Sequence, residues 1–333
     1  MITDAIEYML RNKADFPAKP EHLKELAQAY AMSVRKQILE VREHGDHQPQ
    51  ILAPSRATKC VRQSFYKRVG LLGEPPAPRR NLTFWWGDLT EASLRFLAQI
   101  SGVAIAGSER KLTIPVGSGE VTGYVDDIAQ GKNSGKRFLI EYKSMTGFTF
   151  KSFRDAGEKG LPVPDAFGYS GQVQMYIRGG LEAGIIDPPG WCLIMTFNKD
   201  TGHIYERFVK YEPKVAEVAD RNYELIKKAE ETGTPPPRLI HDGVGGHTEL
   251  VPYKKARAKK GSLPELPLQC GYCDYRWSCW EGRDPESFEL DGDSYLPVFK
   301  EGDKGNGDRV ELNFSHDRFG SAKPVWNYRA VEV

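Results

Sequence analysis

The sequence has no apolar run approaching the roughly 20 residues that a membrane-spanning helix needs, so we expect no membrane partner. Its first residues, MITDAIEYMLRNKADF, are acidic and amphipathic and lack a signal-peptide core, which predicts a cytoplasmic protein. An excess of charge is missing as well. The chain carries 46 Lys and Arg against 45 Asp and Glu, a formal net charge of +1, so any nucleic-acid surface must be a local patch.

Cysteine is scarce, with five in 333 residues, yet three of the five form one C-x2-C-x5-C run. These are Cys270, Cys273 and Cys279, and Cys60 lies 210 residues upstream (270 minus 60). Disulfides are rare in the cytoplasm, which leaves zinc or an iron–sulfur cluster. Structural zinc usually takes two close-spaced pairs, whereas a cluster accepts thiolates from distant chain positions. The spacing therefore favours iron–sulfur, and Cys192, in an apolar run, is expected in the core.

A complete nucleotide-binding loop is also missing. Residues 131–136, GKNSGK, have three residues between the glycines where a phosphate-binding loop has four, and Arg137 follows where Ser or Thr is needed. We therefore predict that the chain has no ATP-driven motor of its own.

What the sequence does contain is a charged hairpin over residues 121–143. Two strand-like runs, 121–129 and 137–143, flank the turn sequence GKNSG. Glu141 and Lys143 share one face of the second strand, and the turn can bring Asp126 beside them. Two carboxylates and an ammonium form a hard-oxygen site for Mg²⁺ or Mn²⁺. Taken alone, this pattern is better explained by alternating charge on a solvated hairpin.

Further elements are predicted along the chain. Apolar periodicity predicts helices over 3–12, 21–44, 84–100, 166–180 and 212–232, a strand over 111–116, and a second hairpin over 191–209 with its turn at 198–202. A proline-rich loop is expected over 73–81. Residues 55–69 read as a basic helix capped by Ser55 that carries Cys60. It is either a solvated helix or one that offers its cations to a DNA backbone, and these cations are Arg56, Lys59, Arg62, Lys67 and Arg68.

Four patterns occur in order along the chain: Gly123-x-x-Asp126, Glu141-x-Lys143, Gln172-x-x-x-Tyr176, and the one-plus-three cysteines. Together they resemble the RecB-type branch of the PD-(D/E)XK nuclease superfamily. More narrowly, they are similar to its iron–sulfur members, the CRISPR-associated adaptation exonucleases and the AddB-type nuclease domains. The resemblance covers residues 55–285.

The resemblance implies an α/β fold, a restriction-endonuclease-like core with a central mixed sheet flanked by helices and an iron–sulfur clasp. Residues 1–54 would be an N-terminal helical segment, residues 55–285 the nuclease core, and residues 286–333 a β-rich appendage. The strand-like alternation of VELNFSH and VWNYRAVEV supports such an appendage.

The resemblance also implies roles for individual residues. The family's Gly-x-x-x-His pattern is here Gly87 followed by Glu91, so a glutamate replaces the histidine. Asp127 would be the alternative ligand if the strand register differed by one. A [4Fe–4S] cluster would bind Cys60, Cys270, Cys273 and Cys279. The divalent ions would bind Asp126, Glu141, Glu91 and the carbonyl of Tyr142, with Lys143, Gln172 and Tyr176 completing the catalytic set.

The expected function is therefore a metal-dependent, ATP-independent DNA exonuclease. It would act on single strands or duplex ends in recombination, repair or phage DNA processing, with a recombination or helicase protein as the expected class of partner. Two other functions fit the same residues: a non-catalytic DNA-binding or assembly module, and a structure-selective endonuclease.

Overall fold

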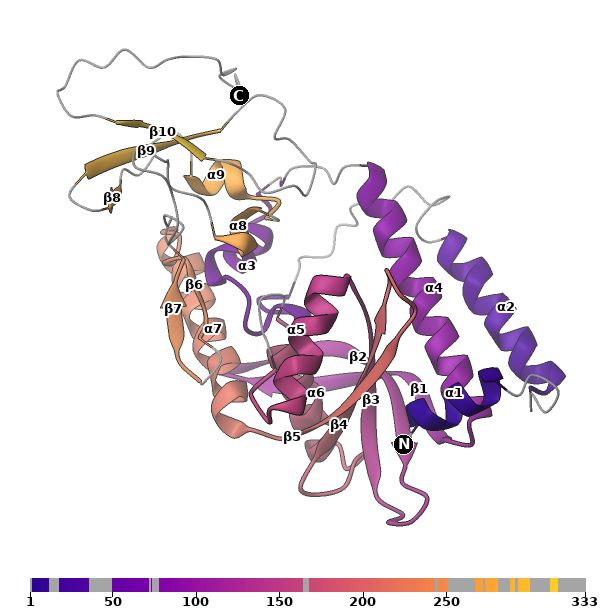
Figure 1. Ribbon diagram of the computed structural model, residues 1–333. Coiled ribbons are helices and arrows are strands. Elements are labelled where there is room, and N and C mark those ends of the chain that lie inside the picture. Colours follow the sequence, from indigo (N-terminus) through magenta and orange to yellow (C-terminus); the bar gives the residue numbers. More distant parts are fainter. Residues whose placement is uncertain are drawn as a thin grey trace.

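A computed structural model gives the fold of the protein (Figure 1). The residues that it describes are 2–11, 18–35, 50–71, 73, 78–163, 168–242, 245–250, 267–271, 273–280, 288–290, 293–299 and 312–316. None of the helices within these ranges combines the length and apolarity that crossing a bilayer requires.

A five-stranded mixed sheet forms the centre, in the order β1-β2-β3-β4-β5. Strands β3 and β4 pair in parallel, and the other neighbours pair antiparallel. Both predicted hairpins are confirmed, β2–β3 and β4–β5, and the predicted mixed sheet is confirmed with them. The strands are β1 (Ala104–Val116), β2 (Gly119–Gln130), β3 (Arg137–Met145), β4 (Trp191–Asn198) and β5 (Ile204–Lys210).

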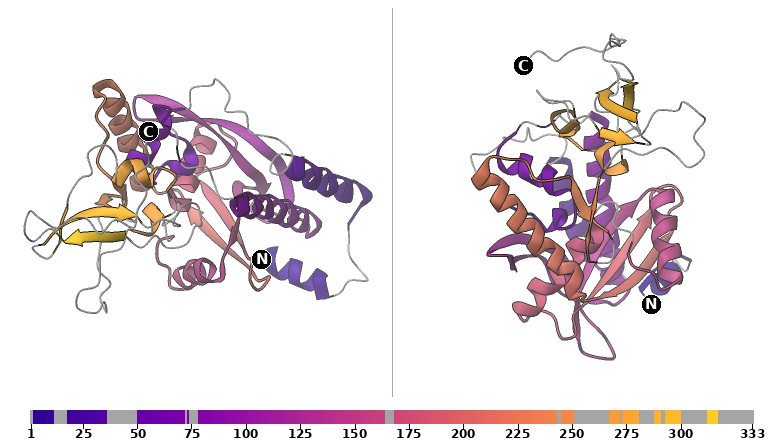
Figure 2. Two further views of the ribbon diagram at one scale, coloured as in Figure 1. Left: turned by 90° about the horizontal axis from the view of Figure 1, so that it is seen from above. Right: turned by 90° about the vertical axis from the view of Figure 1, so that its left-hand side faces the viewer.

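Helices cover both faces of the sheet, with α1, α2 and α4 on one side and α5, α6 and α7 on the other (Figures 1 and 2). Alternate residues of β3 enter different cores. Leu139 packs with the α5–α7 side, and Ile140 packs with α1 and α4. Each fully buried aliphatic side chain contributes about 1.5–3 kcal/mol. The helices are α1 (Ile2–Arg11), α2 (Pro20–Val34), α4 (Pro78–Ile100), α5 (Gly147–Glu158), α6 (Tyr169–Glu182) and α7 (Pro213–Thr232).

Helix α4 begins earlier than the sequence predicted. Residues 78–81 were expected in the proline-rich loop, but the helix starts at Pro78. Proline is well tolerated in the first helical turn, where its missing N–H would have no partner inside the helix. The prediction of α2 is confirmed over Pro20–Val34, and its remainder to residue 44 lies mostly outside the described residues.

The cap prediction for the next helix was wrong. Ser55 lies inside the short 3₁₀ helix η3 (Pro54–Arg56), and α3 (Val61–Arg68) begins after Cys60 instead. Backbone bonds from Ala57 to Pro54 and from Lys59 to Arg56 turn the chain between the two helices. Cys60 therefore stands at the start of α3, on a segment held against the core by buried Ala57 and Thr58.

Smaller elements complete the described chain. The later cysteines lie in or beside two short helices, α8 (Leu268–Gly271) and α9 (Arg276–Trp280). A three-stranded antiparallel sheet forms within the predicted appendage, whose last predicted strand, 325–333, lies outside the described residues. Its strands are β8 (Phe288–Leu290), β9 (Asp293–Phe299) and β10 (Leu312–His316), and a separate hairpin joins β6 (Leu239–His241) to β7 (His247–Glu249).

The packing of α6 on the segment before α3 yields a stability prediction. A Cβ added to Gly171 would overlap the side chain of Thr58, so Gly171→Ala should lower the free energy of unfolding by about 1–3 kcal/mol. The matched control is Gly87→Ala in α4, where the new Cβ would meet the Ser144 Oγ at an ordinary 3.7 Å. That change should be neutral or stabilise the helix by up to about 1 kcal/mol. Urea unfolding measures both, and equal midpoints for the two variants would contradict the close approach.

Candidate functional site

The charged hairpin places Asp126 and Glu141 where the β2–β3 ladder ends. The last paired residues in this direction are Asp127 and Ile140, so Asp126 and Glu141 occupy the next positions on their strands. There a side-chain hydrogen bond replaces the backbone pairing of the two strands, because the Asp126 Oδ2 accepts the N–H of Tyr142 at 2.8 Å. The sheet therefore opens at the position where the two predicted carboxylates stand.

Glu141 is 2% exposed and is held by groups from two elements. Its Oε1 receives an ion pair from the Nζ of Lys143 and a hydrogen bond of 2.8 Å from the Nε2 of Gln172 on α6. The phenol of Tyr176, one helical turn along α6, hydrogen-bonds the side chain of Gln172. The structure thus brings together Asp126, Glu141, Lys143, Gln172 and Tyr176, as the sequence predicted.

Glu91 reaches the same cluster from α4. Its carboxylate interacts electrostatically with Glu141 and Lys143, and the Nη2 of Arg95 lies 3.2 Å from its Oε1. One turn earlier, Gly87 approaches the Ser144 side chain at the end of β3. Helix α4 therefore delivers a third carboxylate to the cluster.

Burial sets the charge state of this cluster. Burial and the negative charge of Glu141 raise the pKa of Asp126 well above its ordinary value, and burial likewise raises the pKa of Glu91. Burial alone would lower the pKa of Lys143, but Glu141 and Asp126 outweigh it and raise that pKa above its ordinary value. Lys143 therefore stays protonated, and the crowded carboxylates favour a further cation.

Each of the three carboxylates has one oxygen anchored by a donor. The anchored atoms are Asp126 Oδ2, Glu141 Oε1 and Glu91 Oε1, and within the described residues no hydrogen bond to the second oxygen is found. Oxygen ligands of this kind suit Mg²⁺ or Mn²⁺. Within the described ranges, no group of three or more His, Cys, Asp or Glu side chains stands at metal-ligand spacing, and this holds for the three carboxylates and for the cysteines alike.

Two residues lie at the back of this cluster: Asp127, the predicted alternative ligand, and Arg95, which was not predicted as functional. Asp127 is fully buried, accepts a 2.7 Å bond from the Tyr142 hydroxyl and pairs with the Nε of Arg95 at 3.2 Å. The Asp127 carboxylate therefore serves the fold, which leaves Asp126 as the candidate ligand. Arg95 could have been noticed because it lies four residues after Glu91, on the same helix face.

The four predicted cluster cysteines converge, although 210 residues separate Cys60 from Cys270 (270 minus 60). All six pairs among Cys60, Cys270, Cys273 and Cys279 are within electrostatic range of each other. Cys192 is separate, 1% exposed in β4 as predicted. Burial raises the pKa of the Cys60 thiol to about 11, and it raises the pKa of Cys270 and of Cys273. Ionising such thiols requires a strong local cation, which a metal centre provides.

Each of the four sulfurs also accepts an N–H donor. Arg238 Nε donates to the Cys279 Sγ at 3.1 Å, and the Tyr275 backbone N–H donates to the Cys273 Sγ at 3.4 Å. The Trp280 side chain donates to Cys270, and backbone groups at the start of α3 donate to Cys60. Donors of this kind orient and stabilise thiolates at metal centres.

Two cations of the predicted basic segment join elements of the fold. Arg62 is 9% exposed, and its Nε donates to the carbonyl of Pro236 at 2.6 Å. Arg68 pairs with Glu230 on α7 at 3.2 Å. The buried Arg62 is therefore not available to a phosphate backbone, and the prediction was wrong for this residue.

No protein-family model matches the chain, and no curated protein matches it. Among solved structures, the chain is similar to the crystal structure of SSO0001, with 15% identity and a TM-score of 0.41 over 78% of this chain and 97% of that one. An alkaline exonuclease (LHK-Exo) from Laribacter hongkongensis matches with 15% identity and a TM-score of 0.36 over 55% and 88% of the two chains. LHK-Exo in complex with dAMP gives 13% identity and 0.35 over 63% and 92%. These identities and TM-scores assign the chain to no family.

Proposed function

We propose that the protein is a metal-dependent, ATP-independent DNA exonuclease whose centre is the cluster of Asp126, Glu141, Glu91 and Lys143. The observation that carries the proposal is the state of the three carboxylates. Each is tethered through one oxygen beside a protonated lysine. Buried carboxylates with a neighbouring cation are what divalent-ion chemistry on a phosphodiester requires. The order of the sequence motifs supports DNA as the substrate.

The residues of the cluster have separate roles in the proposed mechanism. A divalent ion held by the carboxylates, with the Tyr142 carbonyl as a further ligand, would supply Lewis-acid chemistry to the phosphodiester and to the attacking water. Lys143 stays protonated and stabilises negative charge that develops on the phosphate. Gln172 holds Glu141 in place, and Tyr176 holds Gln172, so α6 fixes the geometry of the ligand set.

The four cysteines are proposed to hold a [4Fe–4S] cluster with a structural role. Cys60 follows Thr58, and Thr58 packs directly on Gly171 of α6, next to Gln172. Joining Cys60 to the α8–α9 region would fix this segment against α6 and through it support the carboxylate cluster. Loss of a thiolate should therefore loosen the core as well as release the cluster, because metal binding and folding are coupled.

Cleavage of labelled DNA tests the proposed activity. With Mn²⁺, the wild-type protein should shorten end-labelled linear single strands and leave closed circular single strands intact. Glu141→Gln should lower the rate at least about 100-fold, because even residues one contact away from a metal cost 10–100-fold. The matched control is Glu120→Gln, an exposed residue of β2, which should keep the wild-type rate.

Other results of the cleavage assay would favour the two alternative functions or another site. Cutting of the circles would replace the exonuclease with a structure-selective endonuclease. Binding of DNA without any cutting, by protein with its full metal content, would leave a non-catalytic DNA-binding or assembly module. Cleavage that survives Glu141→Gln would show that the centre lies elsewhere.

Iron content tests the cluster. Protein purified without oxygen should be brown and hold about four iron atoms per chain. Cys270→Ser should lose the colour and iron, whereas Cys192→Ala, in a cysteine that interacts with Glu141 and Asp126 and not with the other four, should keep both. A colourless protein with stoichiometric zinc would overturn the iron–sulfur assignment.

A further inference from the structure

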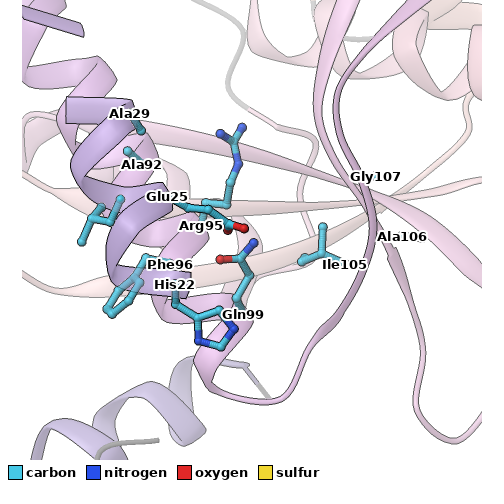
Figure 3. Close-up of a pocket in the computed structure, with 11 residues that line it drawn as sticks. His22, Glu25, Ala29, Ala92, Arg95, Phe96, Gln99, Ile105, Ala106 and Gly107 are labelled. Carbon is cyan, nitrogen blue, oxygen red and sulfur yellow. The ribbon is translucent and has the colours of Figure 1, made fainter. Parts of the chain in front are cut away.

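Arg95 is a partly buried cation behind the carboxylate cluster, on the opposite side from Lys143. Its side chain is 15% exposed and leaves α4 beside a cavity of about 460 Å³ between α2, α4 and β1. Figure 3 shows Arg95 and Gln99 on α4, with Ile105 to Gly107 of β1 across the cavity. The cation is thus built into the wall between the helices and the sheet.

One guanidinium connects the backs of several proposed ligands. Its Nη2 donates to the Glu91 Oε1 at 3.2 Å and to the Asp126 carbonyl at 3.3 Å. Its Nε pairs with Asp127 at 3.2 Å, and Asp127 in turn holds the hydroxyl of Tyr142. Its Nη1 lies 3.3 Å from the Glu109 Oε1 on β1. Glu91, Asp126 and Tyr142 therefore share one anchor.

We propose that Arg95 is a positioning residue that sets the spacing of the metal ligands without touching the metal or the DNA. This inference rests on the metal site of the proposed function. A planar guanidinium offers donors in a fixed fork, so Nη2 can hold Glu91 of α4 and the Asp126 carbonyl of β2 while Nε holds Asp127. A lysine keeps the charge but has one nitrogen, so it cannot hold these groups at two fixed positions.

A test of the positioning role must separate the effect of Arg95 on ligand spacing from the effect of its charge, and the local charges show why. Asp126, Asp127, Glu91, Glu141 and Glu109 carry five formal negative charges, and Arg95 and Lys143 carry two positive ones, so negative charge is in excess by three (five minus two). Removing the charge of Arg95 would attract cations more strongly while loosening the ligands. Arg95→Lys preserves the charge and removes the fork alone.

The test measures Mn²⁺ binding directly. Full-length protein is added to Mn²⁺, and binding is read from the fall of the electron-spin-resonance signal of free Mn²⁺. Arg95→Lys should weaken Mn²⁺ binding about 10-fold or more, as losses of groups that orient metal ligands do. In cleavage assays it should raise the half-saturating Mn²⁺ concentration by the same factor, with most of kcat regained at saturating Mn²⁺.

The matched control is Arg178→Lys. Arg178 is 12% exposed and forms an equally bidentate pair with Asp220, at 2.6 and 3.0 Å, between α6 and α7. It should leave Mn²⁺ binding unchanged. If Arg95→Lys fails to fold, Asp127→Asn decides instead, because it releases the same guanidinium while its amide oxygen can still accept the Tyr142 hydroxyl bond. It should weaken Mn²⁺ binding in the same direction.

The outcomes separate this inference from the proposed function. Wild-type Mn²⁺ affinity in Arg95→Lys and in Asp127→Asn would overturn the positioning role and leave the nuclease standing. An equal loss in Arg178→Lys would overturn it too, because the effect would be general. Binding of Mn²⁺ without cleavage by the wild-type protein overturns the nuclease alone, and absence of Mn²⁺ binding overturns the metal site together with the role of Arg95.

Discussion

The burial of charge in β3 is the constraint on which the site depends. This strand lies between β2 and β4, with helices over both faces, and yet it carries Glu141, which is 2% exposed. Burying an ionised carboxylate is costly unless opposite charge and hydrogen bonds compensate it. Lys143 and Gln172 provide that compensation, and the Tyr142 amide does the same for Asp126. The crowding that remains is the physical basis of the divalent cation proposed for this site.

The same strand organises both faces of the site. Because side chains alternate along a strand, Glu141 turns toward α6 while the Tyr142 ring turns toward α4. On the α6 side, Gln172 and Tyr176 hold the ligand set from the front. On the α4 side, Arg95 and Asp127 hold it from behind. A mixed sheet covered by helices on both faces is what allows one short segment to be fixed from two directions.

The two proposed centres differ in chemistry but share a mechanical connection. Carboxylate oxygens favour hard cations such as Mg²⁺, whereas thiolates favour softer metals, so neither set should compete for the other's metal. The connection runs through Thr58, which precedes Cys60 by two residues and packs on Gly171 of α6. Helix α6 carries Gln172, which binds Glu141. A clasp through the cysteines would therefore stabilise the helix that fixes the ligands.

Sequence alone determined the two hairpins of the central sheet and which side chains meet at the first of them. Strand alternation and a short turn are local properties, so the hairpin that carries Asp126 and Glu141 was predictable, as was the helix that carries Gln172 and Tyr176. The cysteine spacing likewise indicated that Cys60 meets the later three cysteines.

Only the tertiary structure decided which of the charged residues serve the site and which serve the fold. Arg62 and Arg68 look available in the sequence, but they bind Pro236 and Glu230, whereas Arg95, unremarkable in sequence, holds Glu91 and Asp127. Asp126 and Asp127 are adjacent in the sequence, and in the structure they differ because the Tyr142 hydroxyl and the Arg95 Nε bind the carboxylate of Asp127. The physical reason is that the groups bound to a charged side chain decide whether it is available to the site. Those groups come from elements that are distant in the chain.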